Sequence, residues 1–257
     1  MTAAVTPVVK LYVIAGSHAC RSAMLMLEHK KLEYVTVQLP TGMHPLLLRA
    51  VGFAGNREPI REVDGAVPAD LALLDRLGTV PALRSGERRV QTNRAIARFL
   101  EDERPAPPLF PADEAERRAV EEAERWGDEV LQMAARRVAL ATASHGLGAM
   151  HRHAADGRLG PLLSRRGPVR AIASRMAGRS FRAGAANEAA LIAATGPLLD
   201  KVDAWIEAGV LGSQELNVAD FMIAPSLALL TYRPELSTQI VERPAGGLVD
   251  RLLPEPA

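Results

Sequence analysis

The chain contains a single cysteine, Cys20, among its 257 residues, so it cannot form an intrachain disulfide. This is typical of a reducing compartment, and we expect the cytoplasm. Long apolar runs are missing as well. The longest candidate, Leu11–Leu27, is interrupted by Arg21, whereas a membrane-spanning helix needs about 20 apolar residues. Residues 1–9 carry no basic side chain, which argues against a signal peptide. We therefore expect no membrane partner.

The chain also lacks an excess of either charge. Its 31 Lys and Arg residues are balanced by 30 Asp and Glu residues, for a net charge of +1. No broad positive field is available to attract nucleic acid, and we expect no such partner. Lysine itself is scarce, which together with many alanines and prolines indicates GC-rich, bacterial coding. The four lysines are Lys10, Lys30, Lys31 and Lys201.

Four prolines between Glu103 and Asp113 divide the chain into two parts. Proline has no backbone N–H and a fixed φ, so neither a helix nor a central strand continues through this segment. Strand and helix patterns alternate before the segment, whereas the pattern after it is helical almost throughout. We predict an α/β domain over residues 1–104 and an all-helical domain over residues 112–257, a division that the chain length also favours.

The first part predicts a strand, a helix, a strand, an irregular region, a hairpin and a final helix. Apolar residues from Cys20 to Leu27 recur at helical spacing, and β-branched residues favour the strands on either side, which indicates a parallel β-α-β unit. Asn93 is predicted to cap the final helix. The predicted strands are Val8–Ile14, Leu32–Gln38, Thr79–Leu83 and Arg88–Gln91, and short helices are predicted over Pro45–Val51 and Ala69–Leu77.

Helix signals dominate the second part. Asp113 is predicted to cap a helix whose apolar residues keep a spacing of three and four as far as Val138, about seven turns. A second amphipathic helix is predicted over Leu191–Ile206. Asn217, with Asp220 three residues later, forms a capping box and indicates another helix start.

Four motifs stand in the order found in one family: Ser17-His-Ala-Cys20, Thr79-Val80-Pro81, Gln91-Thr92-Asn93-Arg94-Ala95-Ile96 and Asn217-Val-Ala-Asp220. Together with the element order and the proline-rich linker, they make the chain resemble the soluble, cytosolic-type glutathione S-transferases with a serine-type active-site loop. The resemblance covers about residues 9–230. It implies a thioredoxin-like N-terminal domain, an all-α C-terminal domain that shapes the electrophile site, a homodimer and a role in detoxification.

The resemblance also implies a reaction, in which the thiol of the cosubstrate glutathione is activated for attack on a small electrophile. A free thiol with a pKa of about 8.5 is mostly protonated at neutral pH, and only the thiolate attacks. Ser17, at the positive end of a helix, would donate a hydrogen bond to the glutathione sulfur and favour the thiolate. Val80 and Pro81, joined by a cis peptide, would hold the tripeptide together with Thr92 and Asn93. No metal is implied.

Thr92 and Asn93 stand where the family usually has Glu-Ser. The Asn93 amide can donate to the γ-glutamyl carboxylate at a helix N-terminus, but Thr92 offers no acid for the ligand's ammonium. This departure leaves an alternative open, a non-catalytic protein of the same fold that binds a ligand or serves as a scaffold. A second interpretation of Ser17 is that it only caps its helix.

Other features of the sequence have two interpretations each. Cys20 shares an apolar helix face, which favours a buried, unreactive thiol over a glutaredoxin-like nucleophile. His18 either polarises a neighbour or faces solvent. Seven arginines from Arg158 to Arg182, without an acid among residues 157–187, either attract an acidic partner or form a solvated face. Three histidines lack the spacing of a metal site, and we expect no metal there: His145, His151 and His153.

Overall fold

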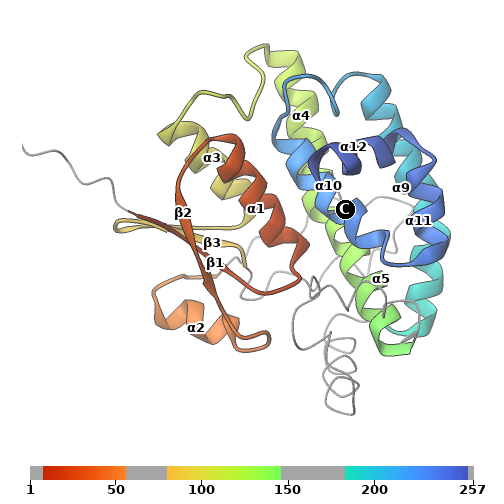
Figure 1. Ribbon diagram of the computed structural model, residues 1–257, viewed down its shortest axis with the longest axis horizontal. Coiled ribbons are helices and arrows are strands. Elements are labelled where there is room, and N and C mark those ends of the chain that lie inside the picture. Colours follow the sequence, from red (N-terminus) through yellow and green to blue (C-terminus); the bar gives the residue numbers. More distant parts are fainter. Residues whose placement is uncertain (1–7, 56–79, 146–182, 254–257) are drawn as a thin grey trace, which may run out of the picture.

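The computed structural model describes residues 8–55, 80–145 and 183–253. The first part contains a four-stranded sheet of order β2-β1-β3-β4, in which β1 is parallel to β2 and antiparallel to β3 (Figure 1). Leu11 in the middle of β1 lies opposite Thr36 on one side and Leu83 on the other. The strands are β1 (Val9–Val13), β2 (Tyr34–Gln38), β3 (Ala82–Ser85) and β4 (Arg88–Gln91). The predicted β-α-β unit and hairpin are confirmed.

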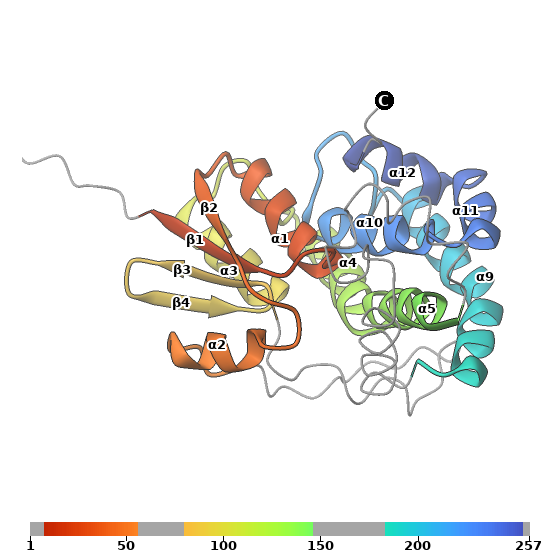
Figure 2. The ribbon, with the colours of Figure 1, turned by 60° about the horizontal axis from the view of Figure 1, so that its bottom comes forward.

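Three helices accompany the sheet: α1 (His18–His29), α2 (His44–Ala50) and α3 (Asn93–Glu103). Helices α1 and α3 pack against each other over one face of the sheet, and α2 lies on the opposite side (Figure 2). Buried apolar side chains, among them Leu27 of α1 and Ile96 of α3, fill the space beneath the two helices. The short helix predicted over Pro45–Val51 corresponds to α2, whereas the one predicted over Ala69–Leu77 lies outside the described residues.

The second part is helical. The long helix predicted from Asp113 is present, but it passes through a π-helical turn, so that α4, η2 and α5 follow one another without a break. Helix α9 begins earlier than the predicted Leu191–Ile206, because its first turns are built from small and polar residues that carry no apolar periodicity. The elements are α4 (Glu114–Trp126), η2 (Gly127–Leu131), α5 (Gln132–His145), α9 (Ala185–Glu207), α10 (Val218–Leu230), α11 (Pro234–Val241) and α12 (Pro244–Leu252).

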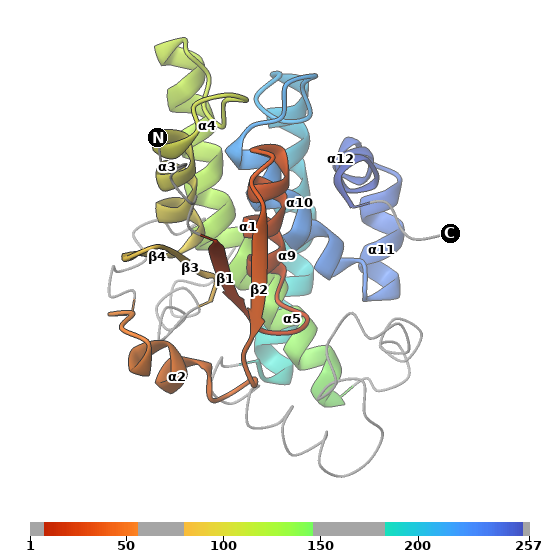
Figure 3. The same ribbon diagram turned by 60° about the vertical axis from the view of Figure 1, so that its left-hand side comes forward.

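The predicted helix caps of the second part are confirmed. The Asp113 carboxylate accepts hydrogen bonds from the amides of Ala115 and Glu116, at 2.8 and 3.0 Å. The capping box of α10 is complete, because Asn217 Oδ1 accepts from Ala219 N at 2.9 Å and Asp220 Oδ2 accepts from Asn217 N at 2.9 Å. Helix α10, buried along almost its whole length, packs against α1, α4 and α5 and so joins the two parts (Figure 3).

The connection between α3 and α4 is tied to the end of α1. Lys30 is fully buried, and its Nζ donates to Glu101 Oε2 at 2.5 Å and to the carbonyl oxygen of Arg104 at 2.7 Å. The same Glu101 oxygen accepts from Leu109 N at 2.9 Å. The predicted fold class, a thioredoxin-like α/β domain followed by an all-helical domain, is confirmed. Within the described ranges, every helix is too short or too polar to cross a membrane.

Candidate functional site

Ser17 lies at the N-terminus of α1, as predicted. Its Oγ accepts a hydrogen bond from Cys20 N at 3.2 Å, and the first turn of α1 contains no acidic residue. Ser17 therefore caps the helix. A hydroxyl that accepts the cap bond still carries a hydrogen that it can donate, and the positive end of the helix dipole favours a negative charge beside it. Capping and donation to an anion are compatible at this position.

The peptide bond between Val80 and Pro81 is cis, at the entry to β3. Both residues are buried. The Pro81 carbonyl oxygen accepts a hydrogen bond from Thr92 N at 3.3 Å. The structure thus brings together two of the predicted glutathione-binding segments that stand apart in the sequence.

The predicted cap of α3 is wrong, because Thr92 occupies that position in place of Asn93. Thr92 Oγ1 accepts from Ala95 N at 3.2 Å, and Thr92 adopts a φ of +84°, a conformation that favours glycine. Asn93 is the first residue of the helix and is 2% exposed. Its Nδ2 donates to the carbonyl oxygen of Ala19 at 3.0 Å, so it ties the start of α3 to the first turn of α1, just behind Ser17.

The remaining oxygen of Asn93, Oδ1, is buried without a hydrogen-bond partner among the described residues. An unsatisfied buried acceptor is uncommon in folded proteins. The amide is directed into the protein, and its Nδ2 is engaged with α1. Asn93 therefore holds the two helix starts of the candidate site in register with each other.

Cys20 is buried, with 1% of its surface exposed. Burial raises the pKa of its thiol to about 11, and the neighbouring Ser17 side chain offsets only part of this effect. A thiol with such a pKa is protonated at neutral pH and does not act as a nucleophile. The interpretation of Cys20 as a core residue is confirmed, and its low reactivity stays a prediction.

His18 does not face solvent, in contrast to one of the two interpretations of this residue. It is buried, and its Nε2 lies 3.2 Å from the carbonyl oxygen of Gln132, at the start of α5. Since a carbonyl only accepts, this ring nitrogen carries the hydrogen. Burial, followed by the positive charge of Arg136, lowers the pKa of His18 to about 3. His18 is thus a neutral contact between the active-site loop and the helical part.

Arg136 of α5 is a residue that the sequence analysis missed. Its charge acts on groups of two elements of the first part. After burial, it is the second cause of the lowered pKa of His18 on α1 and of His44 at the start of α2, and it offsets a small part of the raised pKa of Cys20. In sequence, Arg136 is only one of several arginines on a long helix. Its proximity to α1 arises from the packing of elements that are far apart along the chain.

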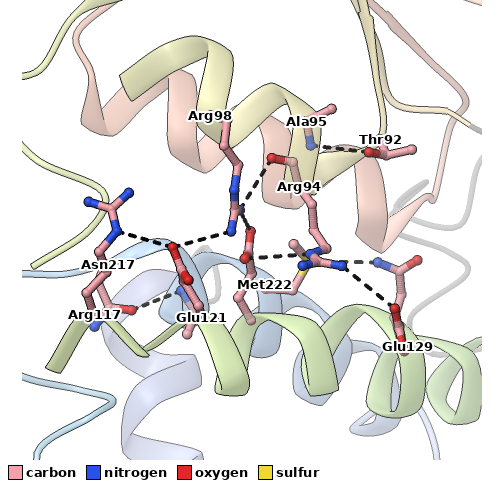
Figure 4. Close-up of polar contacts among 12 residues, drawn as sticks. Thr92, Arg94, Ala95, Arg98, Arg117, Glu121, Glu129, Asn217 and Met222 are labelled. Carbon is pink, nitrogen blue, oxygen red and sulfur yellow. Dashed lines mark hydrogen bonds and ion pairs between the residues drawn. The ribbon is translucent and has the colours of Figure 1, made fainter. Parts of the chain in front are cut away.

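A second group of charges, drawn in Figure 4, lies next to the Thr92–Asn93 turn. Glu124 of α4 is fully buried and accepts from Arg98 Nη1, and its second oxygen lies 3.7 Å from Arg94 Nε. Arg94 Nη1 also lies 3.7 Å from Glu129 Oε1 in η2. Burial raises the pKa of Glu124, and the positive charges of Arg98 and Arg94 offset part of this rise. This network joins α3 to the helical part.

Other sequence features lie outside the described residues, among them the arginine-rich stretch Arg158–Arg182 and the histidines His151 and His153. Over the ranges that the structure describes, no group of His, Cys, Asp and Glu side chains has the arrangement needed to hold a metal ion.

No protein-family model and no curated protein matches the sequence. Solved structures do match the fold. A glutathione S-transferase of Ceriporiopsis subvermispora, solved in complex with glutathione, has a TM-score of 0.58 at 15% identity, with 95% of each chain covered. Glutathione transferase F7 from Populus trichocarpa has a TM-score of 0.54 at 15% identity, over 96% of this chain and 99% of its own. A GST-like protein from Pseudomonas syringae has a TM-score of 0.52 at 17% identity, over 97% and 67%. The chain therefore has the fold of these transferases.

Proposed function

We propose that the protein is a glutathione transferase-like enzyme that activates the thiol of glutathione for attack on a small electrophile. The observation that carries the proposal is the position of Ser17, whose hydroxyl stands at the positive end of α1 and accepts from Cys20 N. That hydroxyl donates its hydrogen to the sulfur of glutathione, and this bond and the helix dipole both favour the thiolate. The attacking sulfur is that of glutathione, since Cys20 is buried and protonated.

In this proposal, the tripeptide lies along the segments around the cis-proline and the start of α3. The backbone of Val80, ahead of Pro81, pairs with the cysteinyl part of glutathione as an added strand would. Thr92 and backbone amides at the start of α3 receive the γ-glutamyl carboxylate, since a helix N-terminus favours an anion. Asn93 contributes by holding this turn against Ala19.

The proposal extends to the setting of the enzyme. The single, buried cysteine supports a reducing, cytoplasmic setting, and the scarcity of lysine supports a bacterial origin. A homodimer and a role in detoxification follow from the resemblance to glutathione transferases. The helical part, in which the Gln132 carbonyl of α5 contacts His18 at the start of α1, shapes the electrophile site.

The experiment is calorimetry with glutathione, followed by a conjugation assay with a chlorodinitrobenzene-type acceptor. We expect binding and turnover for the wild type, and for Ser17→Ala a loss of turnover of at least tenfold with glutathione still bound. Ser85→Ala, in the hairpin away from α1, is the matched control. Because Ser17→Ala also removes a cap worth about 1 kcal/mol, melting curves must establish that the variant is folded at the assay temperature. Full activity of Ser17→Ala would remove Ser17 from its proposed role.

A second candidate function is ligand binding or scaffolding without catalysis. It is favoured by the absence of an acid at Thr92 and by the inward direction of the Asn93 amide. Glutathione binding without turnover over a broad panel of electrophiles would support this second candidate. Failure to bind glutathione at all would refute the proposed transferase.

A further inference from the structure

The first turn of α5 contacts the N-terminal end of α1. His18, the residue after Ser17, contacts the carbonyl oxygen of Gln132 through its Nε2 at 3.2 Å. Arg136 lies one helical turn further along α5, on the same face as Gln132, and its Nη2 donates to Gln132 Oε1 at 3.2 Å. A continuous chain of contacts therefore leads from Ser17 to the guanidinium of Arg136.

The charge of Arg136 reaches the groups that surround Ser17. Beside the larger effect of burial, it contributes to the lowered pKa of the adjacent His18, and it offsets a small part of the raised pKa of Cys20, whose amide donates to Ser17 Oγ. After burial, it is the second cause of the lowered pKa of His44, at the start of α2. At neutral pH, the imidazole of His18 is neutral and the thiol of Cys20 is protonated, whereas the guanidinium of Arg136 is always charged.

We propose that Arg136 supplies the positive charge that stabilises the thiolate of glutathione at Ser17. The inference rests on the proposed function and adds a residue of the helical part to its site. When the thiol ionises, the S–H bond breaks, the proton passes to solvent water, and the electron pair stays on the sulfur. The Ser17 hydroxyl donates a hydrogen bond to this anion, while Arg136 provides the opposite charge. Arg136 is half-buried, which limits the screening of its charge by water.

The test is a titration of the thiolate absorbance of bound glutathione in the wild type, Arg136→Gln and Arg136→Lys. We expect Arg136→Gln to raise the apparent pKa of the bound thiol by about one unit, which corresponds to about tenfold less thiolate at any pH well below it. Arg136→Lys should restore most of the shift, because it keeps the charge. The matched control is Arg118→Gln, which removes an exposed arginine of α4 whose ion-pair partner is Glu114.

Two further measurements separate this role from a merely structural one. Calorimetry at a pH where the bound thiol is protonated should give glutathione affinities for Arg136→Gln within about twofold of the wild type. A nuclear magnetic resonance titration of His44 without ligand should show a higher pKa in Arg136→Gln than in the wild type. If Arg136→Gln does not fold, Arg136→Met keeps the apolar stem and is measured in its place.

The outcomes are distinct. An unchanged thiol pKa in Arg136→Gln, beside a wild type that binds glutathione, would overturn this inference and leave the proposed function standing. A large loss of affinity with an unchanged thiol pKa would also overturn it, because Arg136 would then bind a carboxylate of the ligand. A wild type that binds no glutathione would refute the proposed function, and this inference with it.

Discussion

Thr92 is the position at which a substitution tests the backbone of the candidate site most directly. With φ at +84° and ψ at 148°, it adopts a conformation that is common only for glycine, and β-branched residues fit it worst. Such a conformation costs about 1–3 kcal/mol. Thr92 also caps α3, and its Oγ1 accepts from Ala95 N at 3.2 Å. Strain and capping thus act in opposite directions on the stability of the folded state.

Two variants separate the two effects. Thr92→Ala removes the cap, keeps most of the strain and should lower the free energy of unfolding by about 1 kcal/mol. Thr92→Gly relieves the strain, while as a cap glycine is only a few tenths of a kcal/mol worse than threonine. The greater freedom of glycine in the unfolded chain costs about 0.5–1 kcal/mol. Thr92→Gly should therefore equal or exceed the wild type in stability, and exceed Thr92→Ala by about 1–3 kcal/mol.

The measurement is urea-induced unfolding of the three proteins at neutral pH, with the slope against denaturant concentration compared between them. An equal slope is required, since it shows that the same surface is exposed on unfolding. The reasoning would be refuted if Thr92→Gly were destabilised as much as Thr92→Ala, because the positive φ would then carry no strain.

In the native protein at pH 7.5, Cys20 should react with iodoacetamide about 300-fold more slowly than an exposed cysteine, because a pKa near 11 leaves very little thiolate. Mass spectrometry after a timed exposure measures the extent of alkylation, and rapid alkylation would contradict the prediction. The low folded-state pKa of His18 means that its contribution to stability is lost as pH falls from about 6.5 towards 3. Between pH 7.5 and pH 5, the wild type should lose about 2 kcal/mol more than His18→Gln in chemical denaturation, and equal losses would argue against a neutral, buried imidazole. Gly127→Ala should lower the free energy of unfolding by about 1–3 kcal/mol, because the added Cβ would lie 2.9 Å from Ile223 Cγ1. Gly196→Ala, which meets nothing within 4 Å, should be neutral or stabilising in the same thermal melts.

Local patterns in the sequence were sufficient to predict much of the fold. The strand–helix–strand order around Cys20 and the capping box at Asn217 each depend on residues that lie within a few positions of one another. A cap makes its characteristic hydrogen bonds to the first turn of its own helix, and apolar spacing determines which face of that helix is buried. Packing between elements leaves these features unchanged, because each of them depends on residues close together in the sequence. The domain limits at residues 104 and 112 stay predictions.

The candidate site was predicted less completely, because its geometry depends on contacts between distant segments. Asn93 has the residue type of a cap, yet Thr92 takes that position once the chain turns with a positive φ. No glycine stands there to signal such a turn. His18 has the setting of an exposed loop residue, yet it is buried and its ring contacts the Gln132 carbonyl of the distant α5. Arg136 carries no local signal at all.

Ion pairs of the buried Glu124 restrict how the two parts of the molecule can move. Separating α3 from α4 would strip this carboxylate of Arg98 and Arg94. Breaking a buried ion pair typically costs about 3–5 kcal/mol. Helices α3 and α4 are therefore held together beside the candidate site, and we expect the two parts to keep their relative position when a ligand binds at Ser17.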